Sequence, residues 1–283
     1  MAKALYEEPV FLHVGFPKCG SSFLQKQYFI KSNGFLNLLK EAEDWRLFIQ
    51  HQLLAAQSTN YQIPALCLPE DVENLLVGCS SETFTGGGVG GVDISIAMKR
   101  WARLFPNTRV LIVLRDQRSL VFSWYRQLVK GGYFRSYCKF VKELQWNSQQ
   151  SLWGRLNYHK VYELISNIFE EVLVIPYELL VNEPQEFSAR ICRFYGQPII
   201  ENVRENISQS PNELVIRRAM NYLWRHGVGL PYHSLLPSYV VGEGRNVSNH
   251  LDQKEFRDNI RGPLSRNVRR LSRVLPSMAS LER

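Results

Sequence analysis

Residues 11–22, Phe-Leu-His-Val-Gly-Phe-Pro-Lys-Cys-Gly-Ser-Ser, combine residue types that could bind a phosphate group. The apolar run predicts a short strand, and the two serines predict the start of a helix. Ser22 and Gln25 have the spacing of a capping box. A helix N-terminus offers backbone N–H groups and the positive end of a dipole to an anion, and Lys18 adds a charge. This segment therefore predicts an anionic ligand of nucleotide type.

The same segment differs from the Walker A loop of ordinary NTPases. That loop requires Gly-x-x-x-x-Gly-Lys-Ser/Thr, whereas here Lys18 precedes Gly20. A simple strand-to-helix turn with an exposed lysine also fits these residues. For Cys19, a small buried filler is favoured over a reactive thiol, although a helix N-terminus can lower a thiol pKa.

A second segment, residues 109–127, supports the nucleotide interpretation. Its β-branched apolar run ends at Arg115, and a helix carrying Ser123 is expected to follow. In open α/β sheets, ligands bind outside the carboxyl ends of the strands. An arginine there can clamp a phosphate through two hydrogen bonds, and a serine hydroxyl can donate another.

Taken together and in this order, the two segments resemble the sulfotransferases that use 3′-phosphoadenylyl sulfate (PAPS). The resemblance implies that PAPS is the cosubstrate and adenosine 3′,5′-bisphosphate (PAP) the product. It implies that Arg115 and Ser123 hold the 3′-phosphate. The loop implied to hold the 5′-phosphosulfate consists of Pro17, Lys18, Cys19, Gly20, Ser21 and Ser22.

Three weaker matches extend this resemblance over roughly residues 10–250. They are Val174–Leu180, where Tyr177 and Glu178 are expected to stabilise the fold near the site, Ser80-Ser-Glu82, and the late stretch Gly242-Glu-Gly-Arg-Asn246. In the last, Gly244 and Arg245 are implied to cover the 3′-phosphate. The chain has no Arg-Lys-Gly-x-x-Gly-Asp-Trp stretch, so it is more similar to the carbohydrate and bacterial branches than to the phenol and steroid enzymes.

Sulfuryl transfer to a hydroxyl requires charge stabilisation on the leaving phosphate and a base. Lys18 is expected to supply the first. Glu82 is the favoured base because it ends the strand that follows the loop strand in sequence order and precedes five glycines within Gly86–Gly91. In glycosaminoglycan-type relatives the glutamate lies a few residues earlier, so His233 stays open as the alternative. His13 is expected to be a core histidine.

The composition limits which ligands and which cellular location fit this sequence. The chain has 283 residues, a net charge of +8 and five cysteines without zinc-site spacing. The charge fits a polyanionic cosubstrate, while scattered basic residues without an aromatic platform argue against nucleic acid. No metal is expected. Reduced thiols, the lack of a membrane-length apolar run and an N-terminus without a signal-peptide core predict a cytoplasmic protein, or a soluble fragment of an anchored enzyme.

Alternating strands and helices predict an α/β fold with a P-loop-like parallel sheet flanked by helices on both faces, in one domain over residues 1–283. The predicted strands are Val10–Val14, Leu75–Cys79, Val110–Leu114 and Val172–Ile175. The predicted helices are Ser22–Lys40, Ile94–Leu104, Gln117–Lys130, Leu152–Phe169 and Pro211–Arg225, with further helix starts at Pro69 and Pro184.

The sequence thus predicts a PAPS-dependent sulfotransferase that acts on a hydroxyl, with a carbohydrate as the expected acceptor. Acceptor specificity is expected to reside in Gly86–Gly91, Lys130–Tyr137 and Gly227–Asn249. Two alternatives stay open. One is a P-loop kinase-like phosphotransferase, for which Asp116 is the nearest Walker B candidate, and the other is a nucleotide- or nucleic-acid-binding module without catalysis.

Overall fold

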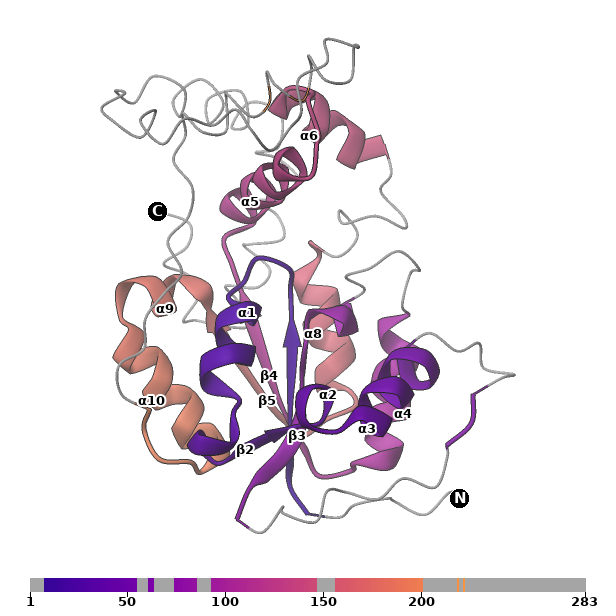
Figure 1. The fold of residues 1–283 in the computed structure, drawn as a ribbon, viewed down its shortest axis with the longest axis vertical. Helices are drawn as coiled ribbons and strands as arrows, with labels where there is room; N and C mark the ends of the chain where they lie inside the picture. The colour runs from indigo at the N-terminus through magenta and orange to yellow at the C-terminus, as the bar shows by residue number, and fades with distance from the viewer. Residues whose placement is uncertain are drawn as a thin grey trace. The chain divides into compact units, whose positions relative to one another are not determined.

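The computed structural model describes residues 8–54, 61–63, 74–85, 93–146 and 156–200, together with positions 218 and 221 (Figure 1). The chain divides into two compact units. Unit 1 comprises Met1–Asp116 and Asn157–Asn206, and unit 2 comprises Gln117–Leu156 and Ile207–Arg283. The first segment of unit 2 interrupts unit 1 in the sequence. The single domain predicted over residues 1–283 stays a prediction.

Unit 1 contains a five-stranded sheet in the order β2-β3-β1-β4-β5, in which every neighbouring pair is parallel. The strands are β1 (Val10–Gly15), β2 (Phe35–Asn37), β3 (Leu76–Ser81), β4 (Thr108–Leu114) and β5 (Glu171–Pro176). Strand β1 is central and all of its residues are buried. The predicted parallel sheet is confirmed, and so are its four predicted strands, whose ends differ from the prediction by at most two residues.

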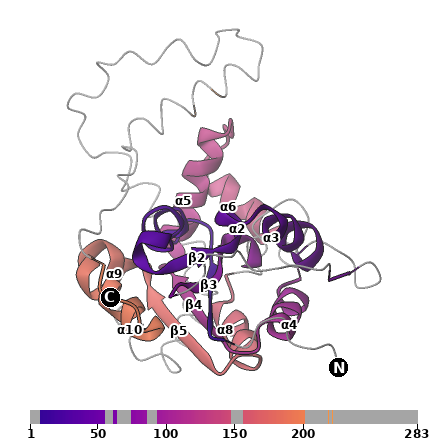
Figure 2. The ribbon, with the colours of Figure 1, turned by 60° about the horizontal axis from the view of Figure 1, so that its bottom comes forward.

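Helices cover both faces of this sheet, as predicted (Figures 1 and 2). Along one face lie α1 (Ser21–Phe23), α9 (Tyr177–Asn182) and α10 (Pro184–Tyr195). Along the other lie α2 (Leu38–Glu41), α3 (Glu43–Leu47), α4 (Ile94–Leu104) and α8 (Tyr158–Ser166). A parallel sheet needs this double cover because both of its faces are apolar. The carboxyl ends of its strands form one edge, here called the carboxyl edge.

The long helix predicted over Ser22–Lys40 is wrong. The chain instead forms α1, a π-helical turn η1 (Leu24–Tyr28), a 3₁₀ turn η2 (Lys31–Asn33) and strand β2. Gly34 breaks the helical pattern with a φ of 79°, a left-handed conformation that favours glycine. The Asn33-Gly34 dipeptide is a turn signal that outweighed the apolar periodicity.

Strand β2 then places its aromatic residue in the core. Phe35 packs against Phe11, Phe29 and Tyr195 with ring centroids 5.2–5.8 Å apart. Edge-to-face aromatic pairs contribute about 0.5–1.5 kcal/mol each beyond their buried area. This packing explains why the segment adds an edge strand to the sheet rather than continuing as a helix.

Other helix predictions can be compared directly. Helices α4 and α5 (Gln117–Lys130) have the predicted bounds, and the side chain of Asp93 caps α4 by accepting from the backbone N–H groups of Ser95 and Ile96. Pro184 begins α10 as predicted. Helix α8 is shorter than the predicted Leu152–Phe169, because the Asn157 side chain caps its start.

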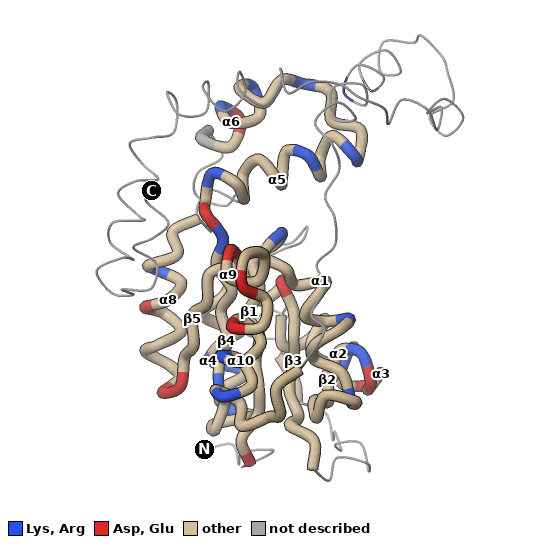
Figure 3. Tube along the Cα trace, turned by 90° about the vertical axis from the view of Figure 1, so that its left-hand side faces the viewer, with Lys and Arg blue, Asp and Glu red and all other residues tan. Residues whose placement is uncertain are grey.

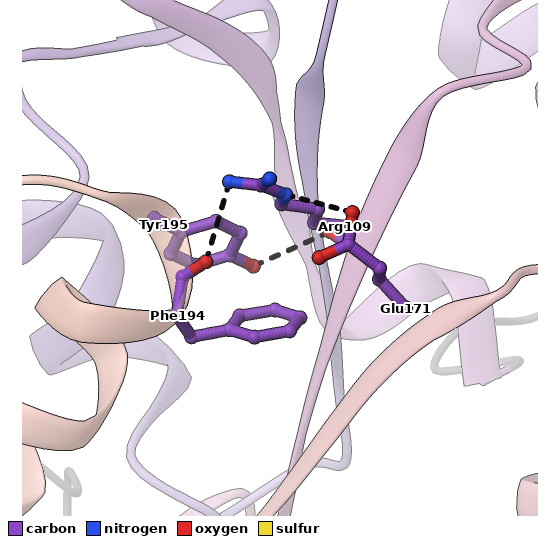
Figure 4. A network of polar contacts seen from close by, with 4 residues as sticks. All are labelled: Arg109, Glu171, Phe194 and Tyr195. Carbon is purple, nitrogen blue, oxygen red and sulfur yellow. Dashed lines mark hydrogen bonds and ion pairs between the residues drawn. The ribbon is translucent and has the colours of Figure 1, made fainter.

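A polar network fixes the opposite, amino edge of the sheet (Figure 4). At the start of β4, Arg109 Nε donates to Glu171 at 3.0 Å, and its Nη1 reaches the carbonyl of Phe194 at 3.4 Å. The hydroxyl of Tyr195 donates to the carbonyl of Arg109 at 3.5 Å. These contacts join β4, β5 and the end of α10.

Unit 2 is built on α5 and α6 (Tyr137–Trp146), which pack through aromatic residues. The ring of Tyr125 lies 5.1 Å from that of Tyr137 and 5.7 Å from that of Phe140. Helix α5 carries basic residues and no acidic ones (Figure 3).

Two residues from the C-terminal segment of unit 2 form hydrogen bonds with α5 and with the turn that follows it. Arg218 Nη1 donates to the hydroxyl of Tyr125 at 3.2 Å. Asn221 donates through Nδ2 to the carbonyls of Val129 at 2.8 Å and Tyr133 at 3.0 Å. Both residues are helical, which agrees with the helix predicted over Pro211–Arg225 at these two positions.

The remaining described turns are η3 (Phe48–Leu54) and η5 (Glu82–Thr85). Cysteines 19, 79, 138 and 192 are free thiols. Among the helices of the described residues, none combines the length and the apolar character needed to cross a bilayer. The helix start predicted at Pro69 lies outside the described residues.

Candidate active site

The loop between β1 and α1 turns through two residues in the left-handed conformation. Lys18 adopts a φ of 68° and Gly20 a φ of 83°. The left-handed conformation costs a residue with a side chain about 1–2 kcal/mol, so Lys18 is held there by its surroundings. Helix α1 begins directly after Gly20, and the first N–H groups of a helix have no intrahelical acceptor. The loop therefore presents donors and the exposed Lys18 at the carboxyl edge.

The capping box expected for this helix is wrong. The N-cap is Gly20, and no side chain caps the helix. Ser22 is exposed, and Gln25 instead donates through Nε2 to the carbonyl of Ser80 at 3.1 Å. Gln25 thus connects the helix to β3, because the turn at Gly20 starts the helix earlier than the spacing suggested.

Most of the other residues of this loop are buried or half-buried, as was expected for Cys19. Cys19 is fully buried, and burial raises its pKa, so it is the inert filler expected rather than a reactive thiol. Ser21 is buried, with Oγ 3.4 Å from the carbonyl of Phe16. Pro17 is half-buried in the turn. A Cβ on Gly15 would lie 2.5 Å from Ser21 Oγ, so the loop requires glycine at this position.

Glu82 lies beside this loop. It begins η5 immediately after β3, the direct neighbour of β1. Thr85, at the end of the same turn, donates to the carbonyl of Gly15 at 2.8 Å, which fixes η5 against the end of β1. Burial raises the pKa of the half-buried Glu82 carboxyl, and the charge of Lys18 partly opposes that rise. Glu82 and Lys18 therefore influence each other electrostatically.

Arg115 follows β4, the other direct neighbour of β1, as predicted. Its Nη1 donates to the backbone carbonyl of Lys18 at 3.0 Å. Its guanidinium lies over the ring of Tyr177, 4.6 Å from the ring centroid. The structure thus brings together, within unit 1, two residues that are far apart in the sequence and that were both predicted to bind phosphates.

The turn from β5 into α9 supports both residues. Tyr177 and Leu180 pack against the loop so closely that a Cβ on Gly20 would lie 3.2 Å from Leu180 and 3.4 Å from Tyr177. Glu178 accepts a hydrogen bond from the backbone N–H of Asp116 at 3.0 Å through Oε1. The predicted supporting role of Tyr177 and Glu178 agrees with these contacts.

His13 lies below the loop in the centre of the sheet. It is fully buried, and its Nδ1 is hydrogen-bonded to Ser80 Oγ at 2.8 Å. Burial lowers its pKa to about 3, so the imidazole is neutral at physiological pH. Its Nε2 is buried without a hydrogen-bond partner among the described residues. The core position of His13 was predicted, whereas its unpartnered nitrogen was not.

The sequence reasoning missed Tyr158. This residue begins α8, is 2% exposed, and donates from its hydroxyl to the carbonyl of Arg115 at 3.0 Å. Its ring packs edge-to-face on Phe16 at 4.9 Å. The sequence shows only that Asn157 could cap a helix beginning at Tyr158. That pattern does not indicate a contact between Tyr158 and the end of a strand far earlier in the chain.

The remaining predicted site residues stay predictions. Ser123 is half-buried on α5 in unit 2 and stays a prediction. Gly244, Arg245, His233 and the glycines of Gly86–Gly91 lie outside the described residues.

Comparison with known proteins gives one family match. Residues 96–201 match the model of the sulfotransferase family. The matched segment contains Arg115, Ser123, Tyr177 and Glu178, and the Lys18 loop and Glu82 precede it. The match confirms the resemblance to sulfotransferases through this segment. No curated protein matches the sequence.

Solved structures that are similar to the chain include two sulfotransferases. A sulfotransferase from Alicyclobacillus acidocaldarius has 19% identity and a TM-score of 0.49, covering 77% of this chain and 95% of that one. The sulfotransferase domain of the Synechococcus PCC 7002 olefin synthase has 16% identity and a TM-score of 0.46, covering 81% and 90%. The α/β fold class itself follows from the parallel sheet and its flanking helices.

Proposed function

We propose that this protein is a sulfotransferase that moves the sulfuryl group of PAPS to an acceptor hydroxyl and releases PAP. The observation that carries the proposal is the hydrogen bond from Arg115 to the carbonyl of Lys18. It joins the segment that resembles a 5′-phosphosulfate loop to the residue that resembles a 3′-phosphate ligand. The family match over residues 96–201 supports the same class of reaction.

The residues at the carboxyl edge suit such a nucleotide. Lys18 and the first N–H groups of α1 would bind the 5′-phosphosulfate, and Arg115 would bind the 3′-phosphate. Charge builds on the leaving phosphate during transfer, so Lys18 would contribute most in the transition state. Ser123, Gly244 and Arg245 are proposed further ligands of the nucleotide from the resemblance.

Glu82 is the proposed base. Its carboxyl is half-buried at the carboxyl edge, and a raised pKa makes an ionised carboxylate a better proton acceptor near neutral pH. The neighbouring charge of Lys18 limits that rise of the Glu82 pKa. Glu82 would take the proton of the acceptor hydroxyl, and His233 is the alternative base.

For the acceptor we propose a carbohydrate hydroxyl, which rests on the similarity to the carbohydrate and bacterial branches. The proposed location is the cytoplasm, supported by the free thiols of the four described cysteines.

Binding and transfer assays test this function. Calorimetry should show that PAP binds more tightly than AMP or ATP. Transfer of radiolabelled sulfate from PAPS to a carbohydrate panel should continue in EDTA, because sulfuryl transfer needs no metal bridging phosphates. ATP binding that exceeds PAP binding, together with magnesium-dependent phosphoryl transfer, would instead identify a kinase-like enzyme. Binding of neither nucleotide would contradict both.

A further inference from the structure

The peptide group that joins Arg115 to Asp116 is held from both sides by side chains of distant segments. The hydroxyl of Tyr158 donates to its carbonyl at 3.0 Å. The carboxylate of Glu178 accepts from its N–H at 3.0 Å. This peptide lies one residue beyond the end of β4, where the hydrogen-bond ladder of the sheet no longer restricts the backbone. The two side chains therefore fix a backbone orientation that the strand itself does not.

Tyr158 is well suited to this contact. It is 2% exposed, and its ring is fixed by edge-to-face packing on Phe16. Burial raises the pKa of its phenol well above the ordinary value, so the hydroxyl keeps its proton and remains a donor. Phe16 begins the loop between β1 and α1, so the Tyr158 ring contacts this loop while the Tyr158 hydroxyl contacts Arg115.

Glu178 makes its contact at a cost to stability. One oxygen accepts from Asp116, while the other, Oε2, is buried without a hydrogen-bond partner among the described residues. A buried polar atom that is left without a hydrogen-bond partner destabilises the folded chain. Apolar packing alone would avoid this cost, so the bond to the Arg115–Asp116 peptide, together with the nearby charge of Arg115, favours a carboxylate here.

We propose that Tyr158 and Glu178 are positioning residues that direct the Arg115 side chain toward the 3′-phosphate of the nucleotide. The orientation of this peptide sets the direction of the Arg115 Cα–Cβ bond, and the ring of Tyr177 below the guanidinium restricts the rest of the side chain. Fixing the arginine before binding reduces the ordering that the ligand must otherwise bring about. This inference rests on the proposed function.

The test compares Tyr158→Phe with a matched control, Tyr195→Phe. Both tyrosines donate to the carbonyl of an arginine at one end of β4, Tyr158 to Arg115 and Tyr195 to Arg109. Calorimetry with PAP and AMP measures the effect, since AMP lacks the 3′-phosphate. Tyr158→Phe should weaken PAP binding by about three- to tenfold, the size expected for one lost hydrogen bond, and leave AMP binding unchanged. Tyr195→Phe should change neither.

Glu178 offers a conservative rescue. In Glu178→Gln the amide oxygen can still accept from the Asp116 N–H, so PAP binding should stay close to that of the unchanged protein. Glu178→Ala removes the acceptor and should weaken PAP binding more than AMP binding. Thermal unfolding of each variant separates loss of fold from loss of positioning.

A double-mutant cycle decides whether the effect passes through Arg115. In the Arg115→Ala background, Tyr158→Phe should have no further effect on PAP affinity. An equal loss for PAP and AMP, or an effect that persists in that background, would overturn the positioning role. If the unchanged protein binds PAP no more tightly than AMP, the proposed function fails instead, so the two failures are distinguishable.

Discussion

The two ends of β4 each carry an arginine, and their surroundings differ in kind. At the amino end, Arg109 pairs with the carboxylate of Glu171 and donates to the carbonyl of Phe194. At the carboxyl end, Arg115 donates to the carbonyl of Lys18 and lies over the ring of Tyr177. A tyrosine hydroxyl donates to the backbone carbonyl of each arginine.

We propose that this difference separates an arginine that serves the fold from one suited to a ligand. Arg109 forms an ion pair with the carboxylate of Glu171. Arg115 instead contacts a backbone carbonyl and an aromatic ring, and its charge partly opposes the rise that burial causes in the pKa of Glu178. Under the proposed function, a phosphate binds at the carboxyl edge and not at the amino edge. The predictions below test whether activity depends on the first edge and stability on the second.

The largest expected effect follows from Glu82→Gln. If Glu82 is the base, PAPS-dependent turnover should fall by about 10²–10⁴-fold, because the amide cannot accept the proton of the acceptor hydroxyl. Since burial raises the Glu82 pKa, the acidic limb of the pH–rate profile should lie above the ordinary glutamate range, and the variant should lose it. Full activity with the limb unchanged would remove Glu82 from the reaction and direct attention to His233.

Lys18→Ala should reduce kcat by about 10²–10³-fold, the usual loss when one preorganised charge-stabilising group is removed. The variant should also move the acidic limb to higher pH, because the Lys18 charge lowers the Glu82 pKa. Rate measurements over a pH series record both effects. A kcat within about twofold of the unchanged protein is too small for a missing electrostatic stabiliser and would rule out the catalytic role.

A smaller effect is expected on stability through His13. Its pKa is about 3 in the folded chain, so protonation of the unfolded chain should reduce stability as pH falls below about 6.5. This one group contributes a slope of up to about 1.4 kcal/mol per pH unit between those values. Urea unfolding of His13→Gln at several pH values should show a flatter acid dependence, and an identical slope would contradict a neutral His13.

The smallest effect is expected at the amino edge. Arg109→Ala removes an ion pair whose side chains are 30% and 52% exposed. Such pairs contribute about 0–1 kcal/mol, so urea unfolding should show a loss no larger than this, and nucleotide affinity should not change. A marked loss of PAP binding would show that the two ends of β4 do not differ in function.

The sequence predicted well the strands that position the candidate site residues, because each motif directly follows an apolar strand. Lys18, Glu82 and Arg115 were expected after β1, β3 and β4, and the pairing of both β3 and β4 with β1 brings those strand ends together. Helix α4 was predicted equally well, since its apolar residues recur at helical spacing and Asp93 caps its start. Local sequence patterns were sufficient to predict a helix or strand wherever the contacts that stabilise it lie within that element.

Long-range packing determined what the sequence did not reveal. Strand β2 replaced part of the predicted Ser22–Lys40 helix because Phe35 joins an aromatic cluster from β1 and α10, which no local pattern encodes. Tyr158 likewise reaches Arg115 from α8, after the segment of unit 2 that interrupts unit 1. Partners of this kind become visible only when the fold brings their segments together.

One measurement tests the central claim most directly: calorimetric titration of PAP and AMP into the unchanged protein, Arg115→Ala and Arg109→Ala. If Arg115 binds the 3′-phosphate, Arg115→Ala should lose more than about 1.5 kcal/mol of PAP binding and much less AMP binding. Arg109→Ala, which removes the same residue type from the other end of the same strand, should match the unchanged protein. Unchanged PAP affinity in Arg115→Ala, or an equal loss in both variants, would contradict the account.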